Sequence, residues 1–129
     1  MDIEKQKLNL LCDAAQLLLE NGSETYRVEE TAQRMAKGLN IEYVNIAALP
    51  TTVFLEADGR ACVRRISRRG TNSRRIAMVN EISREVEHGK LSAEQAERAL
   101  CIGFDAVERA KADEIEILGV GEMGIGNTS

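Results

Sequence analysis

The spacing of apolar residues changes twice along the chain. Up to residue 39 they recur every three or four positions, as in amphipathic helices, and Asn21-Gly22 separates two such stretches. Between residues 42 and 66 they form short β-type runs, interrupted by Pro50 and by Asp58-Gly59, a dipeptide typical of hairpin turns. The helical spacing returns from residue 76. This order predicts an α+β fold: two helices, a three-stranded antiparallel meander, and two further helices packed on one sheet face.

Capping residues set the predicted helix boundaries. Ser23 is a candidate N-cap for the second helix, and Asn72 or Ser73 for the third. Ser92 and Gln95 have the spacing of a capping box, in which each side chain satisfies a backbone N–H at the start of the fourth helix.

Composition limits the class of protein. A chain of 129 residues fits one domain, and no stretch approaches the roughly 18 to 20 apolar residues that span a bilayer. The charged start lacks a signal-peptide core, so we expect a cytoplasmic protein. Cys12, Cys62 and Cys101 are far apart and odd in number, which favours reduced thiols that act as small core residues. Because His88 is the single histidine, we expect no metal site, and nothing indicates a cofactor.

An arginine-rich stretch with no Asp or Glu follows the hairpin, although the net charge of the chain is −4. On a strand, Arg64 and Arg65 must point to opposite faces. One interpretation is an anion surface for lipid headgroups, nucleic acid or an acidic partner. The other is a solvated face whose arginines pair with glutamates of the following helices. The negative net charge and the four aromatic residues argue against nucleic acid. The candidate anion-binding residues are Arg64, Arg65, Arg68, Arg69, Arg74 and Arg75.

Four motifs occur in the order found in the threonine/serine exporter family. They are Asn21-Gly22-Ser23-Glu24-Thr25-Tyr26-Arg27-Val28-Glu29-Glu30-Thr31, Pro50-Thr51-Thr52, Arg69-Gly70-Thr71-Asn72 and Val79-Asn80-Glu81-Ile82-Ser83. Over roughly residues 5–95 the chain therefore resembles the soluble N-terminal domain of that family. In such exporters this domain lies on the cytoplasmic side, ahead of several membrane helices. The resemblance implies the export of small amino or organic acids by the parent protein.

The resemblance implies a binding or regulatory module that is not itself a transporter. Its partner would be a membrane-embedded exporter subunit or domain, which would hold the chain at the inner face of the membrane. Thr25, Arg27 and Glu30 are candidates to line a site. The alternative is a solvated helix face on which Arg27 lies near Glu24 and Glu30.

The chain ends in a glycine-rich segment that follows a predicted short strand at residues 115–120, which can join the sheet edge or stay loose. An exposed edge there could drive formation of a homodimer. Successive backbone N–H groups in such a segment can form an anion-binding nest. Residues 92–129 resemble the helix, strand and phosphate-binding loop of nicotinate-nucleotide–dimethylbenzimidazole phosphoribosyltransferase, an enzyme of cobalamin biosynthesis. The resemblance implies that the phosphate of nicotinate mononucleotide would contact Gly124, Gly126, Asn127 and Thr128, with Glu122 as the catalytic residue near the ribose.

Two resemblances therefore meet within one short chain, as in a chimera or fusion. We predict an exporter-like part over residues 1–91 and a phosphoribosyltransferase-like part over residues 92–129, packed together as a single domain. The benzimidazole pocket and the C-terminal catalytic carboxylate of the enzyme family have no counterpart here, so the alternative for the glycine-rich end is a tail left by truncation or fusion. The leading hypothesis is the binding or regulatory module, and we do not expect the isolated chain to be an enzyme. The alternative is a phosphoribosyltransferase fragment that binds nicotinate mononucleotide or phosphate.

Overall fold

The computed structural model describes residues 3–67 and 69–102. Its elements follow the predicted order, and the α+β class is confirmed. They are α1 (Ile3–Glu20), α2 (Thr25–Gly38), β1 (Val44–Leu49), β2 (Thr52–Ala57), β3 (Arg60–Arg65) and α3 (Ser73–Glu87). A further helical stretch runs through residues 93–102, and the predicted C-terminal strand and glycine-rich loop lie outside the described residues.

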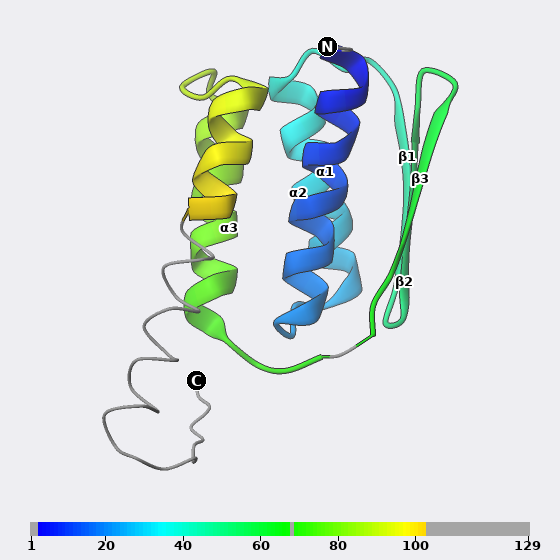
Figure 1. The fold of residues 1–129 in the computed structure, drawn as a ribbon, viewed down its shortest axis with the longest axis vertical. Coiled ribbons are helices and arrows are strands. Elements are labelled where there is room, and N and C mark those ends of the chain that lie inside the picture. The colour runs from blue at the N-terminus through cyan, green and yellow to red at the C-terminus, as the bar shows by residue number, and fades with distance from the viewer. Residues whose placement is uncertain (1–2, 68, 103–129) are drawn as a thin grey trace.

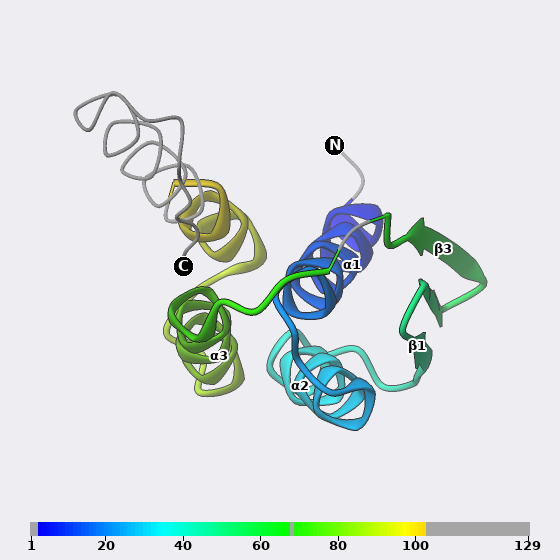
Figure 2. The same cartoon turned by 90° about the horizontal axis from the view of Figure 1, so that it is seen from below.

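The elements form three layers (Figure 1). The antiparallel sheet, in the order β1-β2-β3, forms one layer, and α1 and α2 cover one of its faces (Figure 2). The third layer, formed by α3 and the following helix, packs on α1 and α2 on the side away from the sheet (Figure 1). The last two helices were expected on the sheet itself. They lie one layer further out because α1 already turns apolar residues both to the sheet and to α3, and Leu10, Leu11, Leu18 and Leu19 are all fully buried.

Two turns shape the meander. Leu49 pairs with Thr52, so Pro50 and Thr51 form the tight link between β1 and β2. Asp58 and Gly59 link β2 to β3 with φ values of 54° and 80°, the left-handed conformation that a two-residue hairpin turn requires. Both links match the sequence prediction.

The prediction for the start of α2 was wrong. Ser23 is not its N-cap: Glu24 occupies that position, without a side-chain cap. The N–H of Ser23 instead donates to the carbonyl of Leu18 at 2.9 Å, because Gly22, with φ of 100°, turns the chain back over the end of α1. Ser23 therefore completes α1 rather than opening α2. The other caps were predicted correctly. Asn72 caps α3, and in the capping box the Oγ of Ser92 accepts from the N–H of Gln95 while the Oε1 of Gln95 accepts from the N–H of Ser92.

Candidate functional site

Two of the sequence motifs meet at one end of α1. The N–H of Gly70 donates to the carbonyl of Glu20 at 2.8 Å, and the N–H of Asn72 donates to the carbonyl of Asn21 at 3.0 Å. A β-carbon at Gly22 would lie 2.8 Å from the carbonyl oxygen of Gly70, so only glycine permits this approach. The segment after β3 is thus hydrogen-bonded to the loop that precedes α2.

Buried polar side chains strengthen this junction. Asn21 donates from Nδ2 to the carbonyl of Leu17 at 2.7 Å, and its Oδ1 accepts from the guanidinium of Arg75 at 3.5 Å. Arg75 is 7% exposed, and its backbone N–H donates to Oδ1 of Asn72 at 3.1 Å. The junction therefore sets the position of α2 relative to α3.

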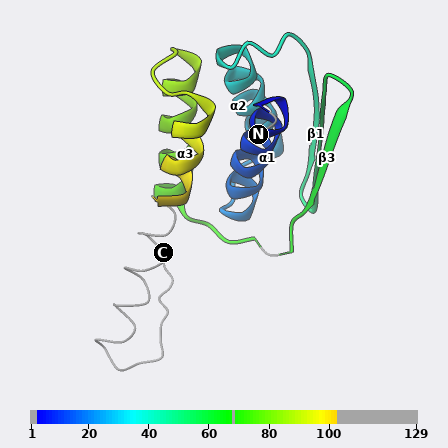
Figure 3. The same cartoon turned by 45° about the horizontal axis from the view of Figure 1, so that its top comes forward.

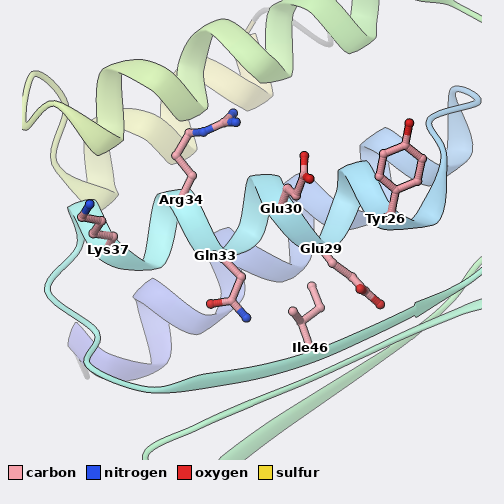
Figure 4. Close-up of a pocket in the computed structure, with 7 residues that line it drawn as sticks. All are labelled: Tyr26, Glu29, Glu30, Gln33, Arg34, Lys37 and Ile46. Carbon is pink, nitrogen blue, oxygen red and sulfur yellow. The ribbon is translucent and has the colours of Figure 1, made fainter.

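A groove of about 670 Å³ runs along α2 beside β1 (Figure 4). Figure 4 shows Glu29 and Gln33 extending from α2 toward β1, while Ile46 extends from β1 toward α2. The groove carries charges of both signs. Its lining residues are Tyr26, Glu29, Glu30, Gln33, Arg34, Lys37 and Ile46.

The free edge of β1 forms one wall of this groove. The N–H of Ala48 donates to Oε2 of Glu29 at 3.0 Å, and the carbonyl of Val44 accepts from Nε2 of Gln33 at 3.3 Å. Because antiparallel strands alternate the direction of their backbone groups, the N–H and C=O of Ile46 point to the same side as those of Ala48. The groove therefore places a strand's free hydrogen-bonding groups between two polar side chains of α2.

The predicted site residues of α2 divide between the groove and the solvent. Glu30 lines the groove. Arg27 is exposed, pairs with Glu24 at 3.0 Å, and lies over the ring of Tyr26 with 5.6 Å to its centroid. Thr25 is half-buried at the first turn. Arg27 therefore fits the interpretation of a solvated helix face, whereas Glu30 fits the interpretation of a residue that lines a site.

A second cavity, of about 310 Å³, opens between α1 and the helical stretch of residues 93–102. Asp13, Gln16 and Glu20 line it from α1, and Glu97 and Cys101 from the other side. Arg64 of β3 reaches the same polar groups: its Nη1 donates to Oδ1 of Asp13 at 2.7 Å and to Oε1 of Gln16 at 2.9 Å.

The carboxyl groups in this cavity affect one another. Desolvation and the neighbouring Asp13 raise the pKa of Glu97 to about 7. Oε1 of Glu97 is shielded from solvent, which disfavours the ionised form of this carboxyl group. The arrangement can exchange a proton near neutral pH.

The three cysteines occupy different environments. Cys12 is buried, Cys62 is half-buried and Cys101 is exposed. Burial and the neighbouring Cys62 thiol raise the pKa of the Cys12 thiol, so it is a core residue as expected. Cys101 is not a core residue, because its side of the helix faces the cavity and the solvent.

The arginines expected to form an anion surface point in different directions. Arg64 and Arg75 turn inward to Asp13 and Asn21, while Arg65 and Arg74 are exposed. The guanidinium of Arg69 donates to the carbonyl of Ser23 at 3.5 Å. The opposite orientations of Arg64 and Arg65 agree with strand alternation. Arg68 lies outside the described residues, and binding of an anion stays a prediction.

The C-terminal site residues cannot be placed. Glu122, Gly124, Gly126, Asn127 and Thr128 lie outside the described residues. Within residues 3–67 and 69–102, no group of three or more His, Cys, Asp or Glu side chains is arranged to hold a metal ion. In the same part of the chain, no helix combines the length and apolar character needed to cross a membrane.

Comparison with known protein families identifies the family of this chain. The model of the family described as Putative threonine/serine exporter matches residues 9–112. The chain belongs to this family. The motif order predicted the exporter relationship correctly, and the junction at Asn21 and Asn72 joins two of the family-like motifs.

A second similarity is confined to a short stretch. Over 39 residues the chain is 54% identical to nicotinate-nucleotide–dimethylbenzimidazole phosphoribosyltransferase of Clostridium perfringens, which covers 30% of this chain and 11% of that protein. The protein of the same name from Geobacter sp. strain M21 is 49% identical over 39 residues, with the same coverage. The chain therefore spans about a tenth of the length of these relatives. No solved structure matches the chain significantly.

Sequence reasoning missed several residues that form the two cavities. Glu29 and Gln33 lie one turn apart on α2 and together reach β1, while Asp13 and Gln16 form a similar polar pair on α1. A polar pair at a spacing of three or four positions within an apolar helix face is the signal that could have indicated them.

Proposed function

We propose that this chain is the extramembrane binding and regulatory module of a threonine/serine-type exporter, held at the cytoplasmic side of the membrane by a membrane-embedded exporter domain or subunit. The single observation that carries the proposal is the groove between α2 and β1, because it offers the family's own motif residues to a ligand. The module would sense the solute, while the membrane-embedded partner would move it.

The chemistry of the groove supports a small zwitterion as the ligand. Glu29 and Glu30 can accept hydrogen bonds from an ammonium group, while Lys37 can pair with a carboxylate; Arg34 is paired with Glu87 of α3 at 3.6 Å. The free N–H and C=O of Ile46 add one donor and one acceptor between them. L-Threonine and L-serine carry both charged groups and a hydroxyl, which makes them the solutes to test first.

Titration with L-threonine and L-serine, followed by amide-resolved NMR, tests the proposal. We expect shifts confined to α2 and β1, with a Kd on the order of 1 mM, as suits an open groove. Glu30→Gln and Lys37→Ala should each weaken binding severalfold, whereas Glu81→Gln, an exposed change on α3, should not. Absence of shifts at about 50 mM ligand, well above that Kd, would rule out the groove as a solute sensor.

A second function is favoured by the 39-residue identity to the phosphoribosyltransferases. On this proposal the glycine-rich end binds the phosphate of nicotinate mononucleotide. The same NMR experiment with that nucleotide, and with inorganic phosphate as control, tests it. Shifts at Glu122, Gly124, Gly126 and Thr128 that are stronger with the nucleotide support a ligand site. Equal shifts with phosphate alone, or none, count against it.

A further inference from the structure

The face of the sheet that points away from the helices carries a cluster of exposed apolar side chains. Figure 3 shows α1 and α2 on one side of the sheet and no described element on the other. Three large apolar side chains lie on that open side: Leu49 is 58% exposed, Phe54 43% and Val63 61%. Such a cluster on one sheet face is typical of an interaction surface.

The strand register arranges this face into three rows. The middle row is apolar, because Ala47 pairs with Phe54 and Phe54 pairs with Val63. One flanking row contains Asn45, Glu56 and Ala61, and the other contains Leu49, Thr52 and Arg65. An apolar centre is thus bordered by a carboxylate on one side and a guanidinium on the other.

We propose that this face binds a second copy of the same chain, with the two sheets stacked face to face about a two-fold axis that runs across the strands. This axis places the middle rows of both copies on each other, so that Phe54 of each copy packs into the apolar row of the other. It also exchanges the flanking rows. Glu56 then lies over Thr52 of the partner subunit, next to Arg65 of the partner subunit, and the same contact recurs on the other side of the axis.

Charge complementarity selects this arrangement. A two-fold axis parallel to the strands would instead place the Glu56 carboxylates of the two copies against each other, which is unfavourable. Glu56 is already oriented within its row, because its Oε1 accepts from Nδ2 of Asn45 at 3.1 Å. The guanidinium of Arg65 extends from an exposed position on β3, where a partner can reach it.

The β1 edge of the sheet is a poorer surface for the second copy than the open face. Glu29 and Gln33 already bond the outward backbone groups of β1 at Ala48 and Val44. A partner strand that paired with this edge would have to displace both side chains. The open face requires no such displacement.

The size of the face predicts a weak dimer. Three strands of six residues cover about 14 Å by 20 Å, roughly 300 Å² on each copy, which is well below the roughly 800 Å² per partner of a standard protein interface. We therefore expect a reversible equilibrium that becomes visible between about 10 µM and 1 mM chain, and that a membrane-held parent protein would favour by raising the local concentration.

Sedimentation velocity of the full chain across that concentration range tests the proposal. The wild type should form a dimer. Phe54→Asp should weaken it at least tenfold, while Ile102→Asp, a change of a more exposed apolar residue outside the sheet, should leave it unchanged. Circular dichroism of each variant checks that the helices remain folded.

Charge reversal gives the decisive comparison, since both positions lie on the open face. Glu56→Arg and Arg65→Glu alone should each weaken the dimer about tenfold, and the double variant should restore it to within about threefold of wild type. A double variant as weak as the single variants, a dimer indifferent to Phe54→Asp, or a monomer at about 1 mM would each overturn the proposal. A monomer that instead binds phosphatidylglycerol vesicles in a Phe54-dependent manner would assign the face to the membrane and overturn it as well.

Discussion

Arg64 of β3 places its Nη1 2.7 Å from Oδ1 of Asp13 on α1 and so ties the sheet to the helical layer across 51 positions of sequence. Both side chains are less than a third exposed, at 28% and 29%. A charge-assisted hydrogen bond at such a site is stronger than a surface ion pair, because solvent screens it less.

Removing Arg64 should therefore destabilise the fold. Arg64→Ala leaves the Asp13 carboxylate without its cation beside Glu97, and we expect the free energy of unfolding to fall by about 1–3 kcal/mol. Arg84→Ala breaks the exposed pair with Glu81, at 2.8 Å, and should cost less than about 0.5 kcal/mol. Urea denaturation of both variants measures the difference, and equal losses would contradict the distinction between the two pairs.

Glu97 should make the stability of the fold depend on pH. Its pKa is raised from 4.5 to about 7, so below about pH 4.5 both the folded and the unfolded chain hold the proton. Between about pH 4.5 and 7 the unfolded chain loses this proton first, and the free energy of unfolding therefore falls as the pH rises. Above about pH 7 Glu97 is ionised in both the folded and the unfolded chain, so the loss in the free energy of unfolding no longer changes with pH. Since Glu97 is partly solvated, we expect a loss of about 1 kcal/mol.

Glu97→Gln tests this dependence, because the amide keeps the shape and cannot ionise. Urea denaturation at several pH values between about 4 and 8 should show a smaller decrease in the variant than in wild type. Glu94→Gln is the matched control on the same helix, where Glu94 pairs with Arg98 at an exposed position. An unchanged pH profile in Glu97→Gln would assign the proton to another group.

Local signals were sufficient to predict most of the fold. Asp58-Gly59 turns the hairpin, Asn72 caps α3, and the apolar spacing locates the helices, because each depends on residues only a few positions apart. The partner of Arg64 could not be predicted in this way. Strand alternation places Arg64 and Arg65 on opposite faces of the sheet. It does not identify the partner of Arg64, because several glutamates of the following helices fit equally well and Asp13 lies 51 positions away in the sequence.

The same distinction explains the error at Ser23. The residue type and position of Ser23 fit an N-cap, but its N–H donates to the carbonyl of Leu18 because Gly22 reverses the chain. The layer order also escaped prediction, because an apolar helix face does not reveal whether a sheet or another helix covers it. For the groove, the family-like motif indicated Glu30, whereas Glu29 and Gln33 became apparent only once α2 and β1 were side by side.

Gly38 should be intolerant of any side chain. It ends α2 where this helix crosses α3, and a β-carbon there would lie 2.2 Å from the carbonyl oxygen of Val86 and 2.6 Å from Cα of Glu87. Replacing glycine by alanine in a helix ordinarily stabilises it by about 0.5–1 kcal/mol. Here the collision with the backbone should reverse the sign and destabilise the fold by about 2 kcal/mol or more. Thermal unfolding of Gly38→Ala measures the effect, and a stabilised variant would exclude the close helix crossing.

Asn72 should act as a helix cap rather than as a binding residue. Its Oδ1 accepts from the N–H of Arg75 at 3.1 Å, while its own N–H donates to Asn21. Asn72→Ala removes the first of these bonds and should lower the free energy of unfolding by about 1 kcal/mol, whereas Asn72→Asp should retain most of it because a carboxylate can also accept this bond. Ser73→Ala, an adjacent change that leaves the cap intact, is the control and should have little effect. Thermal unfolding compares the three variants. If Asn72→Asp were as unstable as Asn72→Ala, acceptance of the Arg75 N–H by the side chain at position 72 would not account for the stability that Asn72 provides.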